Sequence, residues 1–139
     1  MTPEAAGFLD KARKLLADAE AMRTIALTEA AGRTAYLAGF HAAQAFIFEK
    51  RGRTFKTHSG VQAEFARLVK DDPRCDIELR RFLGRTYNLK AIADYETGPR
   101  SRITSAQAQE AVEMAVRFVA AVTALIEPWP ASSIRNVTA

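Results

Sequence analysis

The segment spanning residues 85–99, RTYNLKAIADYETGP, places ionisable side chains in a stretch that otherwise favours a packed helix. Lys90 and Asp94 are four residues apart and Tyr87 precedes Lys90 by three, so in a helix all three share one face. On a surface such an ion pair contributes only about 0.2–0.5 kcal/mol. In an apolar context the pair indicates a partner on another helix, and we expect Arg33 to be that partner. Such a network either contacts a ligand or is purely structural.

A second polar group lies in the alanine-rich segment of residues 24–50. It consists of Arg33, Tyr36, His41 and Gln44. One interpretation is that Tyr36 packs its ring while the other side chains form hydrogen bonds across the bundle. The other interpretation is that these side chains form one wall of a binding site.

A third group is the basic segment of residues 50–61, KRGRTFKTHSGV. Basic side chains just before a helix N-terminus, together with its free amides, favour an anion such as phosphate. The alternative is that the cations are solvated and interact with the C-terminal dipole of the preceding helix. His58 either fixes this loop by a hydrogen bond or donates a proton. The basic residues are Lys50, Arg51, Arg53 and Lys56.

Standard enzyme motifs are absent from the sequence. There is no glycine-rich phosphate loop, no HExxH motif and no nucleophile elbow. The single cysteine, Cys75, can form neither an internal disulfide nor a thiolate metal site. We therefore expect no cofactor and no metal.

The elements that must position these groups are predicted to be helices, because strand and hairpin signals are nearly absent. Apolar residues at three- and four-residue spacing predict a first helix from Pro3, with a break between Ala17 and Arg23. A second, central helix is expected from about Thr24 to Lys50, since apolar residues lie nearly all round it.

Capping signals predict three further helices. The first is short, opens with a capping box of Ser59 and Gln62 and ends near Lys70. The second runs from about Ile77 to Glu96, with Asp76 as its N-cap and Gly98-Pro99 as its stop. The third opens with a capping box of Thr104 and Gln107 and ends at Glu127. The fold class is therefore all-α, an up-and-down bundle of four to five helices. Residues 1–127 are expected to form one domain, and residues 128–139 a frayed C-terminal tail.

Composition limits the cellular setting. The chain has 139 residues, of which 48% are hydrophobic and 26% charged, which is typical of one globular domain. No apolar run approaches the ~18 residues of a membrane span, so we expect a cytoplasmic protein that does not interact with a membrane. The net charge of +4 permits an anionic partner.

Three segments together resemble the HEPN domain family (higher eukaryotes and prokaryotes nucleotide-binding), in particular its small stand-alone bacterial members. They are AGRTAYLAGFHAAQAFIFEKRG at 31–52, KTHSGVQAEFARLVK at 56–70 and YNLKAIADYE at 87–96. The resemblance covers roughly residues 5–127. It implies a bundle of about four or five helices that often forms a homodimer.

The resemblance also implies a function. Many HEPN proteins are ribonuclease toxins that pair with a small nucleotidyltransferase antitoxin and use an arginine followed four to six residues later by a histidine. Here no histidine follows Arg80, Arg81 or Arg85, because the only histidines are His41 and His58. The catalytic residues of the family are therefore not assigned to this chain. A ribonuclease would require His41 or His58 to reach the fourth helix from elsewhere.

The leading hypothesis is a HEPN-like protein that binds nucleotide or RNA, as a homodimer and as the toxin-like component of a pair with a nucleotidyltransferase. Cations would contact phosphate, tyrosines would stack on bases and Asp94 would orient a basic side chain. The alternative is a non-catalytic adaptor or inhibitor that docks a protein partner through its apolar helices. The expected ligand-binding residues are Arg33, Tyr36, Lys56, His58, Lys90, Asp94 and Tyr95.

Overall fold

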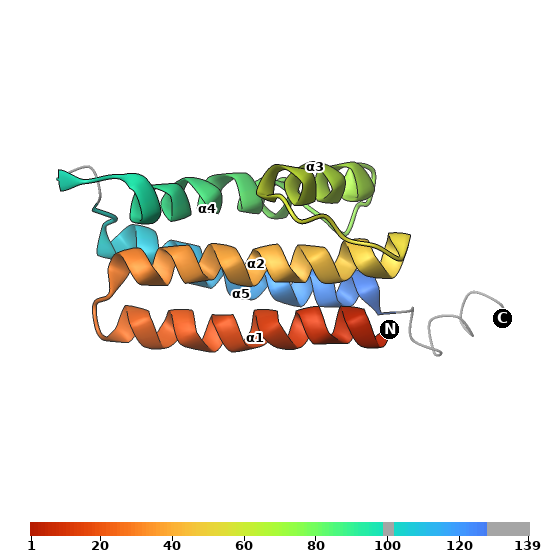
Figure 1. The fold of residues 1–139 in the computed structure, drawn as a ribbon, viewed down its shortest axis with the longest axis horizontal. Coiled ribbons are helices and arrows are strands. Elements are labelled where there is room, and N and C mark those ends of the chain that lie inside the picture. The colour runs from red at the N-terminus through yellow and green to blue at the C-terminus, as the bar shows by residue number, and fades with distance from the viewer. Residues whose placement is uncertain (99–101, 128–139) are drawn as a thin grey trace, which may run out of the picture.

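The structure, a computed structural model, describes residues 1–98 and 102–127. Within these residues the chain forms five α-helices and no strand, so the predicted all-α up-and-down bundle is confirmed (Figure 1). The helices are α1 (Pro3–Thr24), α2 (Thr28–Arg51), α3 (His58–Val69), α4 (Ile77–Tyr95) and α5 (Ser105–Ile126).

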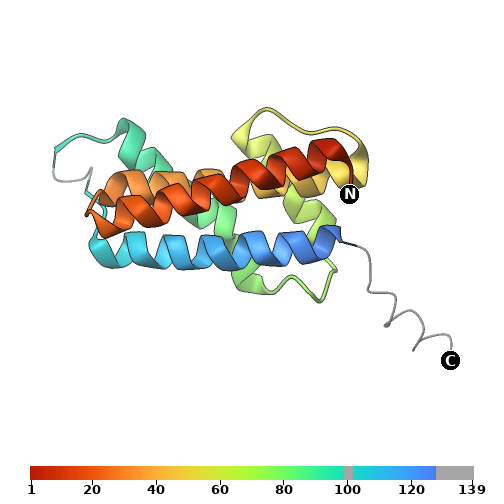
Figure 2. The same cartoon turned by 90° about the horizontal axis from the view of Figure 1, so that it is seen from below.

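Helix α2 lies at the centre of the bundle. It packs against all four other helices, with α1 on one side of it and α3 and α4 together on the other side (Figures 1 and 2). Apolar residues nearly all round α2 were expected from the sequence, and fourteen of its residues are buried. One hydrophobic core cluster draws residues from all five helices. The alanine-rich sequence of α2 allows this close packing because small side chains let several helices approach one backbone.

The contact of α4 with α2 depends on a glycine. A Cβ built at Gly39 would lie 2.3 Å from Cε1 of Phe82, so only glycine leaves room for that ring. Phe82 is 2% exposed and stacks on Phe118 of α5 with ring centroids 4.7 Å apart. This three-helix contact fixes the position of α4 along α2.

The first helix extends further than predicted. The break expected between Ala17 and Arg23 is wrong, because α1 runs without interruption to Thr24, and α2 begins at Thr28 rather than Thr24. The chain turns instead at Ala26, which has a positive φ of 63°. Alanine rarely adopts this left-handed conformation. No glycine or proline lies near residue 26 to mark the turn in the sequence.

Two of the three capping predictions are confirmed. Asp76 accepts a hydrogen bond from the amide of Leu79, and Thr104 forms a capping box with Gln107. The box predicted at residues 59–62 is wrong, because Thr57 caps α3 by accepting from the amide of Gly60. The side chain of Gln62 turns to α2 instead.

The ends of the last two helices lie close to their predicted positions. Helix α4 ends at Tyr95, and Gly98 has a positive φ of 72°. Pro99 and the tail predicted at residues 128–139 lie outside the described residues. None of the helices described here has the length and apolar character needed to cross a membrane.

Candidate functional site

A three-residue ion network joins α2 to the C-terminal half of α4. Arg33 Nε donates to Oδ1 of Asp94 at 2.8 Å, and Lys90 Nζ lies 2.8 Å from Oδ2 of the same carboxylate. The side chain of Lys90 is only 9% exposed, whereas that of Arg33 is 43% exposed. The sequence-based prediction that Arg33 joins the Lys90–Asp94 pair is therefore confirmed.

Electrostatics favour the charged forms of Asp94 and Lys90. The hydrogen bond from Lys90 is the main cause that lowers the pKa of Asp94; burial opposes it, and Arg33 adds to it. The same bond raises the pKa of Lys90. One carboxylate thus faces two cations, and the network has a net positive charge at neutral pH. In the part of the chain that the structure describes, the two terminal nitrogens of Arg33 make no hydrogen bond.

An aromatic cluster adjoins the network. His58, the first residue of α3, lies among Tyr36 and Phe40 of α2 and Tyr87 of α4, with ring centroids 4.8–5.5 Å from each of them. Lys90 Nζ lies 6.0 Å from the centroid of the Tyr87 ring, which connects the cluster to the ion network. Four residues predicted from separate segments, Arg33, Tyr36, His58 and Lys90, thus come together with Asp94.

A short hydrogen-bond chain links Gln62, Tyr36 and His58. The hydroxyl of Tyr36 lies 2.8 Å from Nδ1 of His58 and accepts from Nε2 of Gln62 at 3.4 Å. The hydroxyl can donate to Nδ1, with the ring hydrogen of neutral His58 on Nε2, or it can accept from Nδ1–H as well as from Gln62, because its oxygen has two lone pairs. Burial raises the pKa of Tyr36 to about 12. Burial, with a further contribution from Lys90, lowers the pKa of His58.

The remaining predicted site residues lie at the margin. Tyr95 is 72% exposed, and its ring centroid is 5.2 Å from Lys90 Nζ. Lys56 is exposed in the connection between α2 and α3, and no contact within the described residues ties it to the cluster. Tyr95 therefore contacts the ion network through Lys90, whereas Lys56 is only near it in sequence, two residues before His58.

His41 belongs to a separate, structural contact. Its Nδ1 lies 2.8 Å from Oε1 of Gln44, and Nε2 of Gln44 donates to the carbonyl of Phe55 at 3.2 Å. Burial lowers the pKa of His41. The pair holds the α2–α3 connection against α2. For His41 and Gln44 this agrees with the interpretation that the polar side chains of this segment form structural hydrogen bonds. Arg33 does not take part, so the second polar group of the sequence analysis divides into two.

The cations of the basic segment are also divided. Lys50 lies over the ring of Phe46, Arg53 lies over that of Phe55, and Arg51 pairs with Glu64 at 3.3 Å. These contacts direct the three side chains to different partners, so the segment does not gather into one anion site. Only its last residues, at the N-terminus of α3, reach the cluster.

Two hollows flank α4. One, of about 380 Å³, lies between α3 and α4, and its lining includes Gln62, Arg80, Arg81, Gly84 and Asn88. The sequence analysis did not assign these residues to a site. In the sequence they include two adjacent arginines and a glycine of the segment ELRRFLGR at 78–85, a pattern that does not distinguish a site from an ordinary exposed basic pair.

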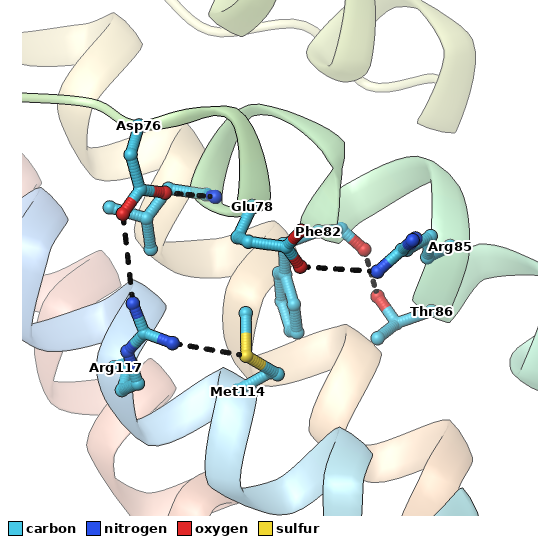
Figure 3. A network of polar contacts seen from close by, with 8 residues as sticks. Asp76, Glu78, Phe82, Arg85, Thr86, Met114 and Arg117 are labelled. Atoms are coloured by element: carbon cyan, nitrogen blue, oxygen red, sulfur yellow. Dashed lines mark hydrogen bonds and ion pairs between the residues drawn. The ribbon is translucent and has the colours of Figure 1, made fainter.

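The other hollow, of about 270 Å³, lies between α4 and α5 and has an apolar floor that includes Phe82, Leu89 and Met114. Figure 3 shows its polar margin, where Glu78 pairs with Arg85 at 3.2 Å. Besides this pair, the lining includes a second glutamate, Glu110, so this hollow is not cationic. As for metals, residues 1–98 and 102–127 contain no group of three His, Cys, Asp or Glu side chains that could hold an ion.

Comparison with known proteins places this architecture in a family. A model of the HEPN domain matches residues 5–125, so the chain belongs to the HEPN domain family. The crystal structure of TT1696 from Thermus thermophilus is similar, with a TM-score of 0.71 and 22% sequence identity. The match covers 88% of this chain and 98% of that chain, and it shows the shared fold. No match to a curated protein is found.

Proposed function

We propose that this HEPN protein binds a nucleotide or RNA through the ion network and the adjoining aromatic cluster. The observation that carries the proposal is the arrangement of Arg33 and Lys90 around the single carboxylate of Asp94, beside the rings of Tyr36 and His58. Such a surface offers an excess positive charge for phosphate. The ring of Tyr95 beside Lys90 is 72% exposed and offers a face for a base, whereas Tyr36 is fully buried and supports the site from within.

Arg33 is the group best suited to contact phosphate. Asp94 holds its Nε, which fixes the plane of the guanidinium, while the terminal nitrogens make no bond within the described residues. A guanidinium held in this way can donate two parallel hydrogen bonds to phosphate. Lys90 is too buried to contact a large ligand directly, so it serves to position Asp94.

The geometry supports binding better than cleavage. Cleavage of RNA at the 2′-hydroxyl requires a proton acceptor near the scissile phosphate. Nδ1 of His58 is bonded to the Tyr36 hydroxyl, so the ring can accept a proton only at Nε2, and only in the tautomer whose hydrogen lies on Nδ1. Its lowered pKa also leaves little imidazolium to act as an acid at neutral pH.

A filter-binding assay with labelled single-stranded RNA at about 50 mM salt tests the binding proposal, because phosphate contacts weaken steeply as salt is added. We expect Arg33→Ala to reduce the affinity roughly tenfold, and Arg33→Lys to restore part of it because the charge returns without the planar fork. Arg13→Ala is the matched control, since Arg13 also pairs with one aspartate, Asp10, but lies on α1. Equal effects of Arg33→Ala and Arg13→Ala would contradict the proposal.

Cleavage is a second candidate because His58 does reach α4 from the start of α3, as a ribonuclease of this kind would require. Incubation of the protein with labelled RNA, beside His58→Ala and His41→Ala variants, distinguishes the two functions. Cutting by the wild type that is lost in His58→Ala and kept in His41→Ala would establish His58 as catalytic. We expect intact RNA in every lane.

The proposal extends to partners. Membership of the HEPN family supports a homodimer and a toxin-like role beside a nucleotidyltransferase antitoxin. Light scattering of the purified protein tests the dimer. The pair is tested by asking whether a neighbouring reading frame encodes a small nucleotidyltransferase and, where it does, by a pull-down of the two proteins. A dimer that binds neither nucleotide nor RNA at low salt would favour the adaptor or inhibitor alternative instead.

A further inference from the structure

The hollow between α3 and α4 has three arginines in its lining, and among the described residues only one of them, Arg85, pairs with a carboxylate, that of Glu78 at 3.2 Å. Arg80 and Arg81 line it, and among its described lining residues there is no aspartate or glutamate. Arg80 donates to the backbone carbonyl of Asp72 at 3.5 Å, and within the described part of the chain neither arginine forms an ion pair with a carboxylate. Two exposed guanidinium groups that line one concave surface raise the local concentration of anions there. The hollow therefore favours a negatively charged ligand.

The floor of this hollow is open. Gly84 lies in the middle of α4, yet a Cβ at that position would meet nothing within 4 Å. Asn88, one turn later, adds an exposed amide that can both donate and accept hydrogen bonds. A glycine inside a helix weakens it, so this residue is better explained by an approaching ligand than by packing within the chain.

The hollow is continuous with the site described above. Gln62 lines it and also donates to the Tyr36 hydroxyl at 3.4 Å. On α4, Arg80, Tyr87 and Asp94 follow one another at intervals of seven residues, which places them on one face of the helix. That face thus has cationic side chains near each end and the ring of Tyr87 between them.

We propose that the α3–α4 hollow is a second anion site, and that it forms one continuous track with the Arg33 network for a single-stranded RNA segment several nucleotides long. A rise of about 1.5 Å per residue separates Arg80 from Asp94 by about 21 Å along the helix. One nucleotide cannot reach both ends, whereas a short strand can place phosphates at each end and a base on the rings between them. This inference rests on the proposed function and specifies its ligand.

Fluorescence anisotropy with labelled oligouridylates of two to ten nucleotides, at about 50 mM salt, tests the track. We expect the affinity to rise with length up to the span of the track. Arg80→Ala/Arg81→Ala should weaken binding of the ten-nucleotide strand roughly tenfold and reduce the slope of log affinity against log salt by roughly 1.4, which is 0.7 for each lost contact. The same variant should leave binding of the dinucleotide unchanged.

Two variants control for general electrostatics and folding. Arg13→Ala/Lys14→Ala removes the same charge from α1, on the opposite side of α2, and should leave the binding of every oligonucleotide unchanged. Arg80→Lys/Arg81→Lys keeps the charge and should keep the salt slope. Circular dichroism of each variant shows whether the helices remain intact.

The outcomes separate the two proposals. Affinity that does not depend on length, but does depend on Arg33, would overturn the track and leave the proposed function standing. Equal weakening by the α1 and α4 double variants would overturn the track as well. Binding that depends on Arg80 and Arg81 but not on Arg33 would support the second site and contradict the proposed function. Displacement of RNA by polyglutamate as readily as by unlabelled oligouridylate would indicate an acidic protein segment and overturn the RNA assignment.

Discussion

The two sides of α4 differ in how their charges are balanced. On the side that faces α5, Glu78 pairs with Arg85, and the N-cap Asp76 lies 3.7 Å from Arg117 (Figure 3). These polar contacts surround an apolar floor. On the side that faces α3, Arg80 and Arg81 have no carboxylate partner among the described residues, and the lining combines Gly84 and Asn88 with the apolar Phe65 and Leu83. Arg85 lies between the two sides and lines both hollows.

The difference separates stability from binding. On the α5 side the hydrogen-bonding groups are satisfied by the chain itself, and the buried rings supply most of the stabilisation. On the α3 side, donors remain for a ligand. Substitutions on the α5 side should therefore change the free energy of unfolding, and those on the α3 side should change affinity.

The largest expected effect is that of Phe82→Ala. Its ring is 2% exposed and fills the space over Gly39 and Phe118, so its removal should lower the free energy of unfolding by about 3–5 kcal/mol. Urea denaturation measures this loss. Arg81→Ala is the matched substitution on the other side and should change stability by less than about 0.5 kcal/mol. A loss of stability in Arg81→Ala as large as that in Phe82→Ala would remove the distinction between the two sides.

Asp94→Ala should have the next largest effect. It leaves the nearly buried Lys90 ammonium without its carboxylate, which costs about 1–3 kcal/mol. Replacing Lys90 with Met in the same background removes the unsatisfied donor and should recover part of the loss. A double-mutant cycle by urea denaturation gives the coupling energy. Additive losses would mean that the two side chains do not interact.

Acid should weaken the fold through its histidines. The pKa values of His41 and His58 lie below the ordinary 6.5. Below about pH 6.5 the unfolded chain therefore binds more protons than the folded chain, and the free energy of unfolding falls from pH 7.5 to pH 5. Asp94, with its lowered pKa, stays ionised over this interval and loses its contribution only at lower pH.

Urea denaturation at the two pH values measures this change. His41→Gln/His58→Gln should flatten the dependence between pH 7.5 and pH 5. The same slope in the double variant would assign the effect to other groups.

Gly84→Ala should stabilise the protein by about 0.5–1 kcal/mol, because alanine is the better helix former and its methyl group enters open space. Thermal denaturation should show a higher midpoint. A lower midpoint would show that the floor of the α3–α4 hollow is packed, and the hollow would lose its role as a ligand site.

The smallest expected effect is that of Glu78→Gln. Glu78 and Arg85 are 46% and 59% exposed, so their ion pair should contribute less than about 0.5 kcal/mol. Thermal denaturation at low and high salt measures this contribution. A larger loss would mean that the polar margin on the α5 side carries more of the stability than its exposure implies.

The sequence predicted those features that depend on local contacts. Asp76 and Thr104 cap their helices by bonding amides three residues away, so neighbouring sequence is sufficient to identify them. The Arg33–Asp94 contact was predicted because an ion pair in an apolar helix requires a further partner. The turn at Ala26 could not be predicted, because a non-glycine residue takes a conformation that tertiary packing imposes.

The second anion site could not be predicted either. Arg80 and Arg81 resemble any exposed basic pair in a helix. They line a hollow only because α3 packs beside α4. The division of the basic segment has the same origin. Lys50 and Arg53 are near His58 in sequence, but the rings on which they lie direct them away from it.

Because Phe82 of α4 packs directly on Gly39 of α2, substitutions at these two positions should depend on each other. A larger residue at position 39 would clash with the Phe82 ring, and the α2–α4 contact would have to adjust. Arg33 and Asp94 lie on these same two helices, so the distance between them depends on the contact between Gly39 and Phe82. In an alignment of homologues, positions 39 and 82 should therefore covary, and lineages that lose this pairing should also lose the Arg33–Asp94 pair.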